Sequence, residues 1–286
     1  MDSKLASATL SLPAPASGGA IVARPGKLAL DFAVVKVLWR RDLVRFFRQR
    51  SRVIGALVQP LIFWVVIGSG FSRSFKMPGA EGVGYLQYFF PGIVLMVILF
   101  TSIFSTMSLI EDRHEGFLQA VLAAPGSRAA LVLGKTLGGA SIALVQVLAI
   151  LLLAPFAGFA YGSIAWASLL AMLVFTSIGL TALGFVVAWW LDSVQGYHAV
   201  MSVLLIPAWI VSGSMFPIAG GPGWMQVLVR INPLSYAASG VRRAMSGANL
   251  PAALAGGSFA IELGVVLAMA LVALALATYV CKKRPA

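Results

Sequence analysis

The sequence predicts an all-α integral membrane protein, and three observations carry this fold class. Of its 286 residues, 60% are hydrophobic and only 10% are charged, whereas a soluble domain carries about 25% charged residues. Six stretches are apolar over roughly the 20 residues that a helix needs to cross the hydrocarbon core of a bilayer. None shows the alternating pattern of a barrel strand, so all six are expected to be helices, which satisfy their own backbone hydrogen bonds in lipid.

The six expected spans form one membrane domain over residues 53–283. Their approximate bounds are 53–71, 88–110, 129–158, 164–190, 199–216 and 260–281. The third span is long enough to tilt, and Pro155 is expected to bend it near one end. The fifth span is the shortest, and Pro207 is expected to interrupt it.

The part of the chain before the first span is expected to lie outside the membrane core. Residues 1–26 are rich in Ala, Ser, Pro and Gly and lack the apolar run of a signal peptide, so residues 1–30 are interpreted as a disordered cytoplasmic tail. Residues 31–52 are expected to form an amphipathic interface helix in the headgroup plane. Nucleic-acid binding is the alternative, and the direct continuation into a membrane span argues against it.

The interface helix is predicted from the way its side chains divide on a helical wheel. One face carries Val35, Leu38, Trp39, Leu43 and Phe46, and the opposite face carries Arg40, Arg41, Arg45, Arg48 and Arg52. A basic face beside an apolar face favours contact with anionic membrane lipid.

Basic residues in the short flanks of the spans predict the orientation. The chain holds 21 Lys and Arg against 9 Asp and Glu, and the bases cluster before the first span and after the last, at Lys282, Lys283 and Arg284. Both termini are therefore expected in the cytoplasm, as in a multi-pass protein of the cell's inner membrane, and this requires an even number of spans. Three arginines, at positions 230, 242 and 243, fall in a long outer loop, where the rule weakens.

The densest acidic cluster of the chain lies between the second and third spans, over residues 111–115. Each charge at the bilayer centre costs roughly 2.5–3.5 kcal/mol, so the cluster must lie in water. Apolar residues recur at helical spacing directly after it, at Phe117, Leu118, Val121 and Leu122. We therefore expect a short amphipathic cytoplasmic helix with Glu111, Asp112 and Glu115 in its first turn, where acidic side chains suit the helix dipole. A solvated loop and a docking element for another protein both fit this pattern.

Two motifs suggest chemistry that the rest of the sequence does not support. Gly134-Lys135-Thr136 is similar to the end of a phosphate-binding loop, but Ala129 stands where that loop needs glycine, and no strand precedes it. Lys135 is interpreted as a lysine near the cytoplasmic end of a span. His114-Glu115 begins like a zinc-protease motif, but Leu118 replaces the second histidine. The chain itself is therefore expected to bind no metal, ATP or other cofactor and to have no catalytic residues.

A larger set of motifs resembles the type-2 ABC exporter permeases over roughly residues 30–283. The first group is Phe90-Pro91-Gly92, Glu111-Asp112-Arg113, Gly116, Leu122, Ala124-Pro125, Ser127-Arg128 and Leu133-Gly134-Lys135. The second group is SGSMFP over 212–217, Pro222 with Trp224, the run from Asn232 to Tyr236, and Arg242.

The resemblance implies a coupling helix that contacts a separate ATPase subunit carrying ATP and Mg²⁺. The residues implied for this contact are Glu111, Asp112, Arg113, Glu115, Gly116, Leu122 and Pro125. It also implies an outer re-entrant segment over 217–236, with Pro217, Pro222, Trp224, Asn232 and Pro233. Two permeases, as a homodimer, and two ATPases would form the transporter.

The leading hypothesis is the membrane-spanning permease subunit of an ATP-driven exporter, itself not an enzyme. The family moves lipid-linked polysaccharides, drugs or other lipids, so the cargo is expected to be amphipathic or lipid-linked. An intramembrane enzyme is one alternative, but it needs ionisable residues deep in the spans. Glu262 and Lys135 lie near span ends, which leaves Gln59, Gln146 and hydroxyl groups. A membrane scaffold or assembly component is the other alternative.

Overall fold

The computed structural model describes residues 26–72, 82–217, 222–247, 250–251, 254 and 257–283. Over these residues the chain forms helices and no strands. Most of the predicted tail, residues 1–25, lies outside the described residues. The interface helix begins earlier than predicted, because α1 spans Lys27–Arg48 and so includes the last residues assigned to the tail.

Six helices of the described chain are long and apolar enough to cross a membrane, as the sequence predicted. They are α2 (Arg50–Phe71), α3 (Tyr85–His114), α5 (Arg128–Leu151), α6 (Trp166–Trp190), α7 with η3 (Val194–Ser214) and α10 (Phe259–Lys283). The chain is therefore an all-α integral membrane protein.

Helix α3 is the centre of the bundle. In its most apolar window 89% of the residues are buried, against 22% for α2 and for α10. It packs against α2, α5, α6 and α7, and its aromatic side chains Phe89 and Phe90 are fully enclosed. A movement of α3 must therefore displace most of the other spans.

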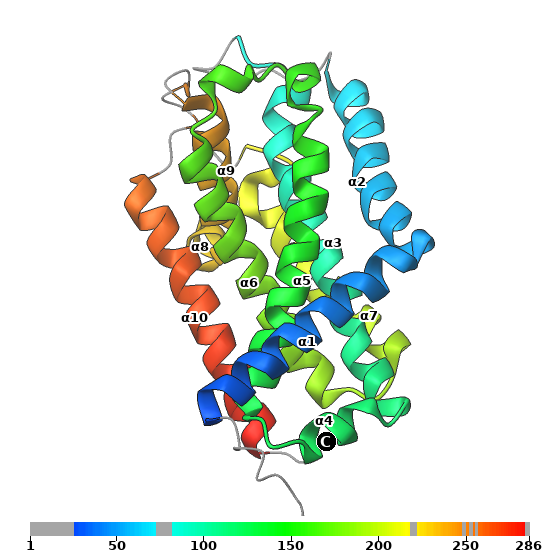
Figure 1. Cartoon of the computed structure of the whole chain (residues 1–286). Helices are drawn as coiled ribbons and strands as arrows, with labels where there is room; N and C mark the ends of the chain where they lie inside the picture. Colours follow the sequence, from blue (N-terminus) through cyan, green and yellow to red (C-terminus); the bar gives the residue numbers. More distant parts are fainter. Residues whose placement is uncertain are drawn as a thin grey trace, which may run out of the picture.

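Helix α1 crosses the bundle obliquely and rests mainly on α5 (Figure 1). The two helices approach closely because α5 has glycine at the crossing. A Cβ atom on Gly134 would lie 2.9 Å from the Cβ of Leu38, and one on Gly138 would lie 3.2 Å from the Cβ of Asp42. The helix ends at Arg48, because φ of −90° and ψ of 79° at Gln49 break the helical path. The predicted boundary at residue 52 is thus wrong, since residues 50–52 already belong to α2.

The third and fifth spans differ from the prediction. Helix α5 ends at Leu151, and the residues around Pro155 form the separate turn η1 (Ala154–Ala157), so the span does not bend there but stops earlier. Helix α7 continues through Pro207 to Trp209. Its path breaks at Gly213, whose φ is +77° inside η3 (Ile210–Ser214), because glycine has no Cβ to forbid that conformation.

The described chain begins and ends at one end of the bundle. The start of α1, the end of α10 and the short helix α4 (Phe117–Ala123) all lie at the lower end in Figure 1. The opposite end carries the link between α5 and α6, which contains η1 and η2 (Tyr161–Ser163). An even number of spans brings both ends of the chain to the same side.

The segment predicted to be re-entrant forms two helices, α8 (Gly223–Ile231) and α9 (Pro233–Ser246). Asn232 joins them: its side chain accepts a hydrogen bond from the Leu234 amide (3.0 Å) and donates one to the Ala208 carbonyl (2.6 Å). Pro233 stands at the start of α9, where its missing N–H costs nothing.

Trp224 is exposed on α8, whereas α9 packs among α6, α10 and η3. Pro217 and Pro222 flank residues 218–221, which lie outside the described residues.

Candidate coupling site at the charged end of the bundle

A glycine with positive φ sets the short helix α4 apart from α3. Gly116 has φ of +77°, a conformation that costs other residues roughly 1–2 kcal/mol. Its amide donates to the Arg113 carbonyl at 3.2 Å, and the chain then turns into α4. The helix stops at Ala124, which is extended because Pro125 follows it. Ser127 then caps α5 by accepting a hydrogen bond from the Ala130 amide.

The acidic residues do not lie in the first turn of α4, so the predicted helix-dipole explanation is wrong. Glu111 and Asp112 belong to the last turn of α3, and Glu115 is the residue that ends it. Carboxylates at a helix C-terminus are disfavoured by its dipole. Basic side chains from other helices offset that cost.

Asp112 is the centre of this charged cluster and is completely buried. Its carboxylate accepts hydrogen bonds from Arg41 at 2.6 and 2.9 Å and from Arg45 at 2.7 Å, both on α1. It also accepts one from the Lys135 ammonium on α5, at 2.5 Å. Three helices therefore meet at one carboxylate, and a buried charge of this kind is stable only when it is so paired.

Lys135 joins a second buried acid to the cluster. Its Nζ donates to Asp42 Oδ1 at 2.9 Å and to Ser108 Oγ at 3.3 Å. Burial raises the pKa of the Asp42 carboxyl, while the neighbouring Lys135 and Arg41 act against that rise. From the sequence, Lys135 was not expected to bind buried acids, and Asp42 was not identified as a candidate residue. The available signal was that Asp42 lies four residues from both Leu38 and Phe46, the apolar face of α1.

The two remaining acids of the cluster, Glu111 and Glu115, form ion pairs with arginines at its edge. Glu111 lies 3.1 Å from Arg45 and also binds Arg52 at the start of α2. Glu115 is more than half exposed and lies 2.9 Å from Arg45. The cluster thus joins α1, α2, α3 and α5 at one end of the bundle.

Arg113 points away from the cluster. Its guanidinium binds Asp192 at 2.7 Å and donates to the carbonyls of Trp189 and Leu191. It therefore fastens the end of α3 to the link between α6 and α7.

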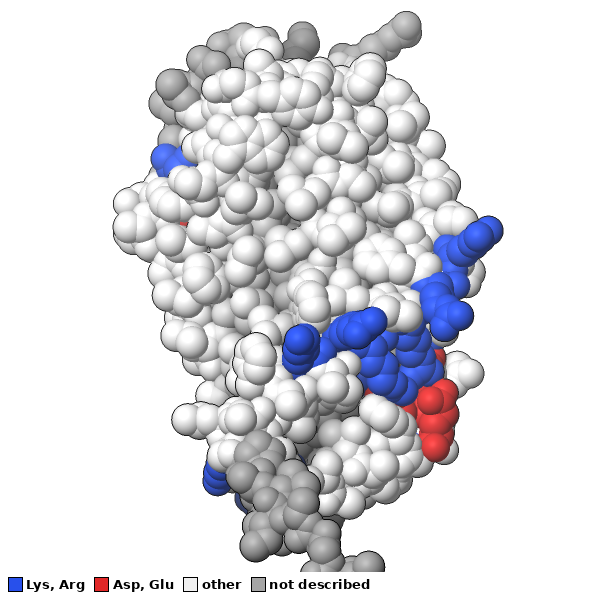
Figure 2. All heavy atoms as spheres, in the orientation of Figure 1, with Lys and Arg blue, Asp and Glu red and all other residues white. Residues whose placement is uncertain are grey.

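The arginines of α1 do not all face the headgroups as predicted. Arg40 and Arg48 are exposed, whereas Arg41 and Arg45 turn toward the acids of α3. In Figure 2 the basic side chains form a patch beside acidic ones on this face. The reason is electrostatic, because charge-assisted hydrogen bonds to a buried carboxylate stabilise a guanidinium more than contact with solvent does.

An apolar groove lies between α1 and α4, beside the charged cluster, with a volume of about 380 Å³. Its walls are Leu30, Ala33, Val34, Val37 and Leu38 on α1, and Phe117, Ala120, Val121, Ala124, Pro125 and Gly126 around α4. The Arg41 guanidinium lies 3.7 Å from the Phe117 ring centroid and so connects cluster and groove. Leu122, in contrast, is half-buried against the core of the bundle.

The predicted ATPase-contact residues thus differ in exposure, and Glu111, Arg113 and Leu122 are partly buried. Glu115, Gly116 and Pro125 are accessible at the surface, while Asp112 is enclosed and can act only through its neighbours. Contact of any of them with an ATPase stays a prediction.

Comparison with known proteins agrees with this architecture. Residues 33–246 match the family described as ABC-2 type transporter. A putative transport permease (ycf38) of Cyanophora paradoxa is 29% identical over 211 residues, which cover 72% of each chain. The daunorubicin resistance ABC transporter permease protein DrrB1 of Streptomyces coeruleorubidus is 26% identical over 78% of each chain. Nodulation protein J of Rhizobium leguminosarum bv. trifolii is 27% identical over 81% of this chain and 87% of its own.

The match covers most of the chain and includes most of α1, the charged cluster, all but Leu30 of the groove lining, and α9. The protein therefore belongs to the ABC-2 type transporter family, as one of its membrane-spanning permeases.

Proposed function

We propose that this permease is the transport subunit of an ATP-driven exporter and that a separate ATPase subunit docks in the groove between α1 and α4. The groove is the observation that carries the proposal. It is an apolar surface beside the ion-pair cluster, whose edge residue Glu115 is exposed, on the end of the bundle where the described chain begins and ends. ATP and Mg²⁺ are held by the ATPase, and both termini of the permease lie with it in the cytoplasm, at the inner membrane.

The contacts around α4 explain how force from the ATPase would reach the spans. Helix α4 has only seven residues and buries one of them, Leu118, so it gains little stability by itself. The cluster around Asp112 instead ties α1 to the end of α3 directly before α4. A push on the groove therefore moves α1 and α3 together, and α3 is the most enclosed span.

The cargo is proposed to be amphipathic or lipid-linked: a drug, a polysaccharide on a lipid carrier, or a lipid. The name of one relative, a daunorubicin resistance permease, supports an amphipathic drug as a member of this class. Spans α2, α7 and α10 each expose apolar side chains, among them Val66, Val203 and Val272. A second copy of the permease would cover part of this surface, and membrane lipid the rest.

The test uses two neighbouring residues of α4. Ala120 lines the groove and is exposed, whereas Gln119 is exposed but does not line it. Ala120→Glu places a charge in the apolar groove, so it should remove the copurifying ATPase and the permease-dependent ATP hydrolysis at unchanged membrane level. Gln119→Glu adds the same charge beside the groove and should keep both.

Full copurification and hydrolysis with Ala120→Glu would refute docking in the groove. ATPase binding without ATP-dependent transport into inverted vesicles would point to a scaffold.

A further inference from the structure

Arg242 is a buried cation at the end of the bundle opposite the acidic cluster. It lies on α9 and is only 8% exposed. Its Nη2 donates to the Gly213 carbonyl at 3.0 Å, and its guanidinium carbon lies 4.4 Å from the ring centroid of Tyr88. These contacts hold the guanidinium in place but supply no negative charge.

The neighbouring arginine, Arg243, has the carboxylate partner that Arg242 lacks among the described residues. Arg243 forms an ion pair with Glu262 at 3.1 Å, whereas no carboxylate of the described residues pairs with Arg242. The Nε of Arg242 is buried and has no hydrogen-bond partner among those residues. A guanidinium carries five N–H donors, and a buried charge without a counter-ion is costly.

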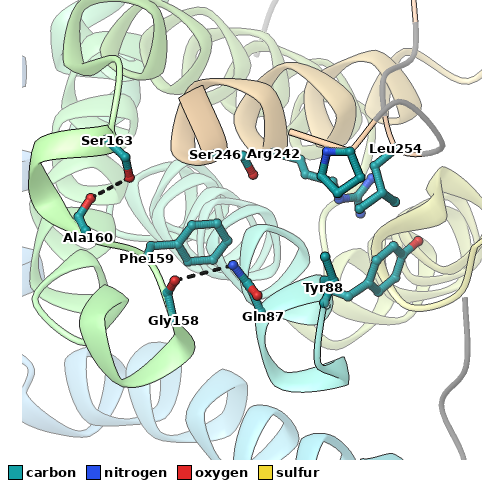
Figure 3. A pocket seen from close by; sticks show the side chains of 11 residues that line it. Gln87, Tyr88, Gly158, Phe159, Ala160, Ser163, Arg242, Ser246 and Leu254 are labelled. Atoms are coloured by element: carbon teal, nitrogen blue, oxygen red, sulfur yellow. Dashed lines mark hydrogen bonds between the residues drawn. The ribbon is translucent and has the colours of Figure 1, made fainter. Parts of the chain in front are cut away.

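A cavity of about 130 Å³ opens beside this guanidinium (Figure 3). Four parts of the chain line it: the start of α3 with Gln87 and Tyr88, the α5–α6 link around Phe159, the end of α9 with Arg242, and the α9–α10 link with Leu254. Arg242 is the only charged residue among the described residues that line it. The cavity exceeds the roughly 10–15 Å³ of accessible space that one water molecule needs, so it has room for a small anionic group.

Backbone contacts fix the walls of the cavity. The Ala165 amide donates to the Ala244 carbonyl at 2.8 Å, which ties the α5–α6 link to α9. The Gln87 side chain donates to the Gly158 carbonyl at 3.3 Å, as Figure 3 shows. At the end of α9, a Cβ on Gly247 would lie 2.2 Å from the Ser163 carbonyl oxygen, so the two segments meet without space for a side chain. The cavity is therefore a built feature of the fold.

We infer that this cavity binds an anionic phosphate or carboxylate group, with Arg242 as its counter-charge. Guanidinium matches both groups through paired N–H donors. The apolar lining residues Val83, Phe159 and Leu254 suit the apolar part of an amphiphile. In the proposed orientation the cavity lies on the outer side, so the anion is the head group of an exported amphiphile. This last step rests on the proposed export function; anion binding itself does not.

The experiment measures anion binding by the purified permease alone, so its outcome is separate from that of the ATPase assay. Thermal unfolding in a neutral detergent is followed with sodium phosphate against sodium chloride at equal ionic strength. The arginines of α1 also respond to phosphate, and this part of the rise in unfolding temperature is common to the wild type and all variants. We expect the phosphate-dependent rise in unfolding temperature to be larger in the wild type than in Arg242→Gln, with affinity at least about tenfold weaker in the variant.

Two further variants keep the test decisive if Arg242→Gln folds poorly. Ser246→Leu fills the cavity from α9 and leaves Arg242 bound to Gly213, so it should also lose the extra response. Arg230→Gln removes an exposed cation of α8 outside the cavity and should behave like the wild type. Equal phosphate responses in the wild type and Ser246→Leu would overturn the inference.

Two comparisons identify the source of the negative charge. A short-chain phosphatidylglycerol that stabilises the wild type more than the matching phosphatidylcholine assigns the cavity to an amphiphile. A response to phosphate alone keeps the anion site and assigns it to a soluble anion. Glu81, outside the described residues, is tested as an alternative counter-ion. A response that appears only in Glu81→Gln would show that this side chain neutralises Arg242, and would overturn the inference.

Discussion

The buried pair of Lys135 and Asp42 allows a sharp test of the charged cluster. Lys135→Met removes the ammonium that lies 2.9 Å from Asp42 and keeps a side chain of similar length. Asp112 still holds Arg41 and Arg45, but the nearest remaining cation to Asp42 is Arg41, at 3.8 Å. Asp42 is only 6% exposed, so its charge stays buried and poorly compensated. Removing one partner of such a pair costs about 3–5 kcal/mol of unfolding free energy.

The double variant Asp42→Asn with Lys135→Met separates pairing from packing. Asparagine has nearly the shape of aspartate but no charge, so the double variant leaves no unpaired charge at this position. We expect it to recover about 2 kcal/mol relative to Lys135→Met, within the range of coupling energies for residues in one salt-bridge network.

Unfolding would be measured in mixed micelles with rising sodium dodecyl sulfate, followed by helical circular dichroism. Arg40→Gln is the matched control, because Arg40 is exposed on the same helix as Asp42. It should change stability by no more than about 0.5 kcal/mol. If Lys135→Met behaves like this control, or if Asp42→Asn gives no recovery, then the cluster does not hold α1 against α3 and α5.

Three further predictions follow from particular residues. Gly116→Ala should lower the unfolding free energy by about 1 kcal/mol because of its positive φ, although a Cβ there would touch only Gln119, at 3.8 Å; unchanged stability in the same micelle assay would contradict this. The Ser127 amide lowers the pKa of Asp31, so the stabilisation from this carboxylate is present above its ordinary pKa and is lost as pH falls through the folded value. The difference in unfolding temperature between wild type and Asp31→Asn should therefore shrink from pH 7 to pH 3, and a constant difference would speak against it. A reporter that is active only in the periplasm, fused after Ala286, should stay silent; activity would reverse the proposed orientation.

The sequence by itself determined the fold class and the number of spans. Lipid cannot satisfy backbone hydrogen bonds, so a long apolar stretch has one stable form, and its length and composition identify it. Helical spacing also predicted the short helix after the acidic cluster, at Phe117, Leu118, Val121 and Leu122. The cluster itself was expected between two spans, but Glu111 and Asp112 belong to the last turn of α3.

The ends of the spans were harder to predict from the sequence, because they depend on contacts with distant parts of the chain. Pro207 was expected to break the fifth span, but the break falls at Gly213. There the Tyr88 hydroxyl donates to the Gly213 carbonyl at 2.7 Å and so satisfies an oxygen that the broken helix leaves free. Such a partner, 125 residues away in sequence, leaves no trace in local periodicity.

Only the tertiary structure decided what the charges do. From the sequence, the arginines of α1 were expected to face the lipid headgroups, and the acids to lie in the first turn of α4. Lys135 was expected to lie near the end of a span. Folding brings Arg41, Lys135 and Asp112 together from three helices. The same fold leaves Arg242 enclosed without a carboxylate among the described residues. Hydrophobic patterning records which face of a helix is buried, but the pairing of buried charges depends on which helices meet, and that is set by packing across the whole bundle.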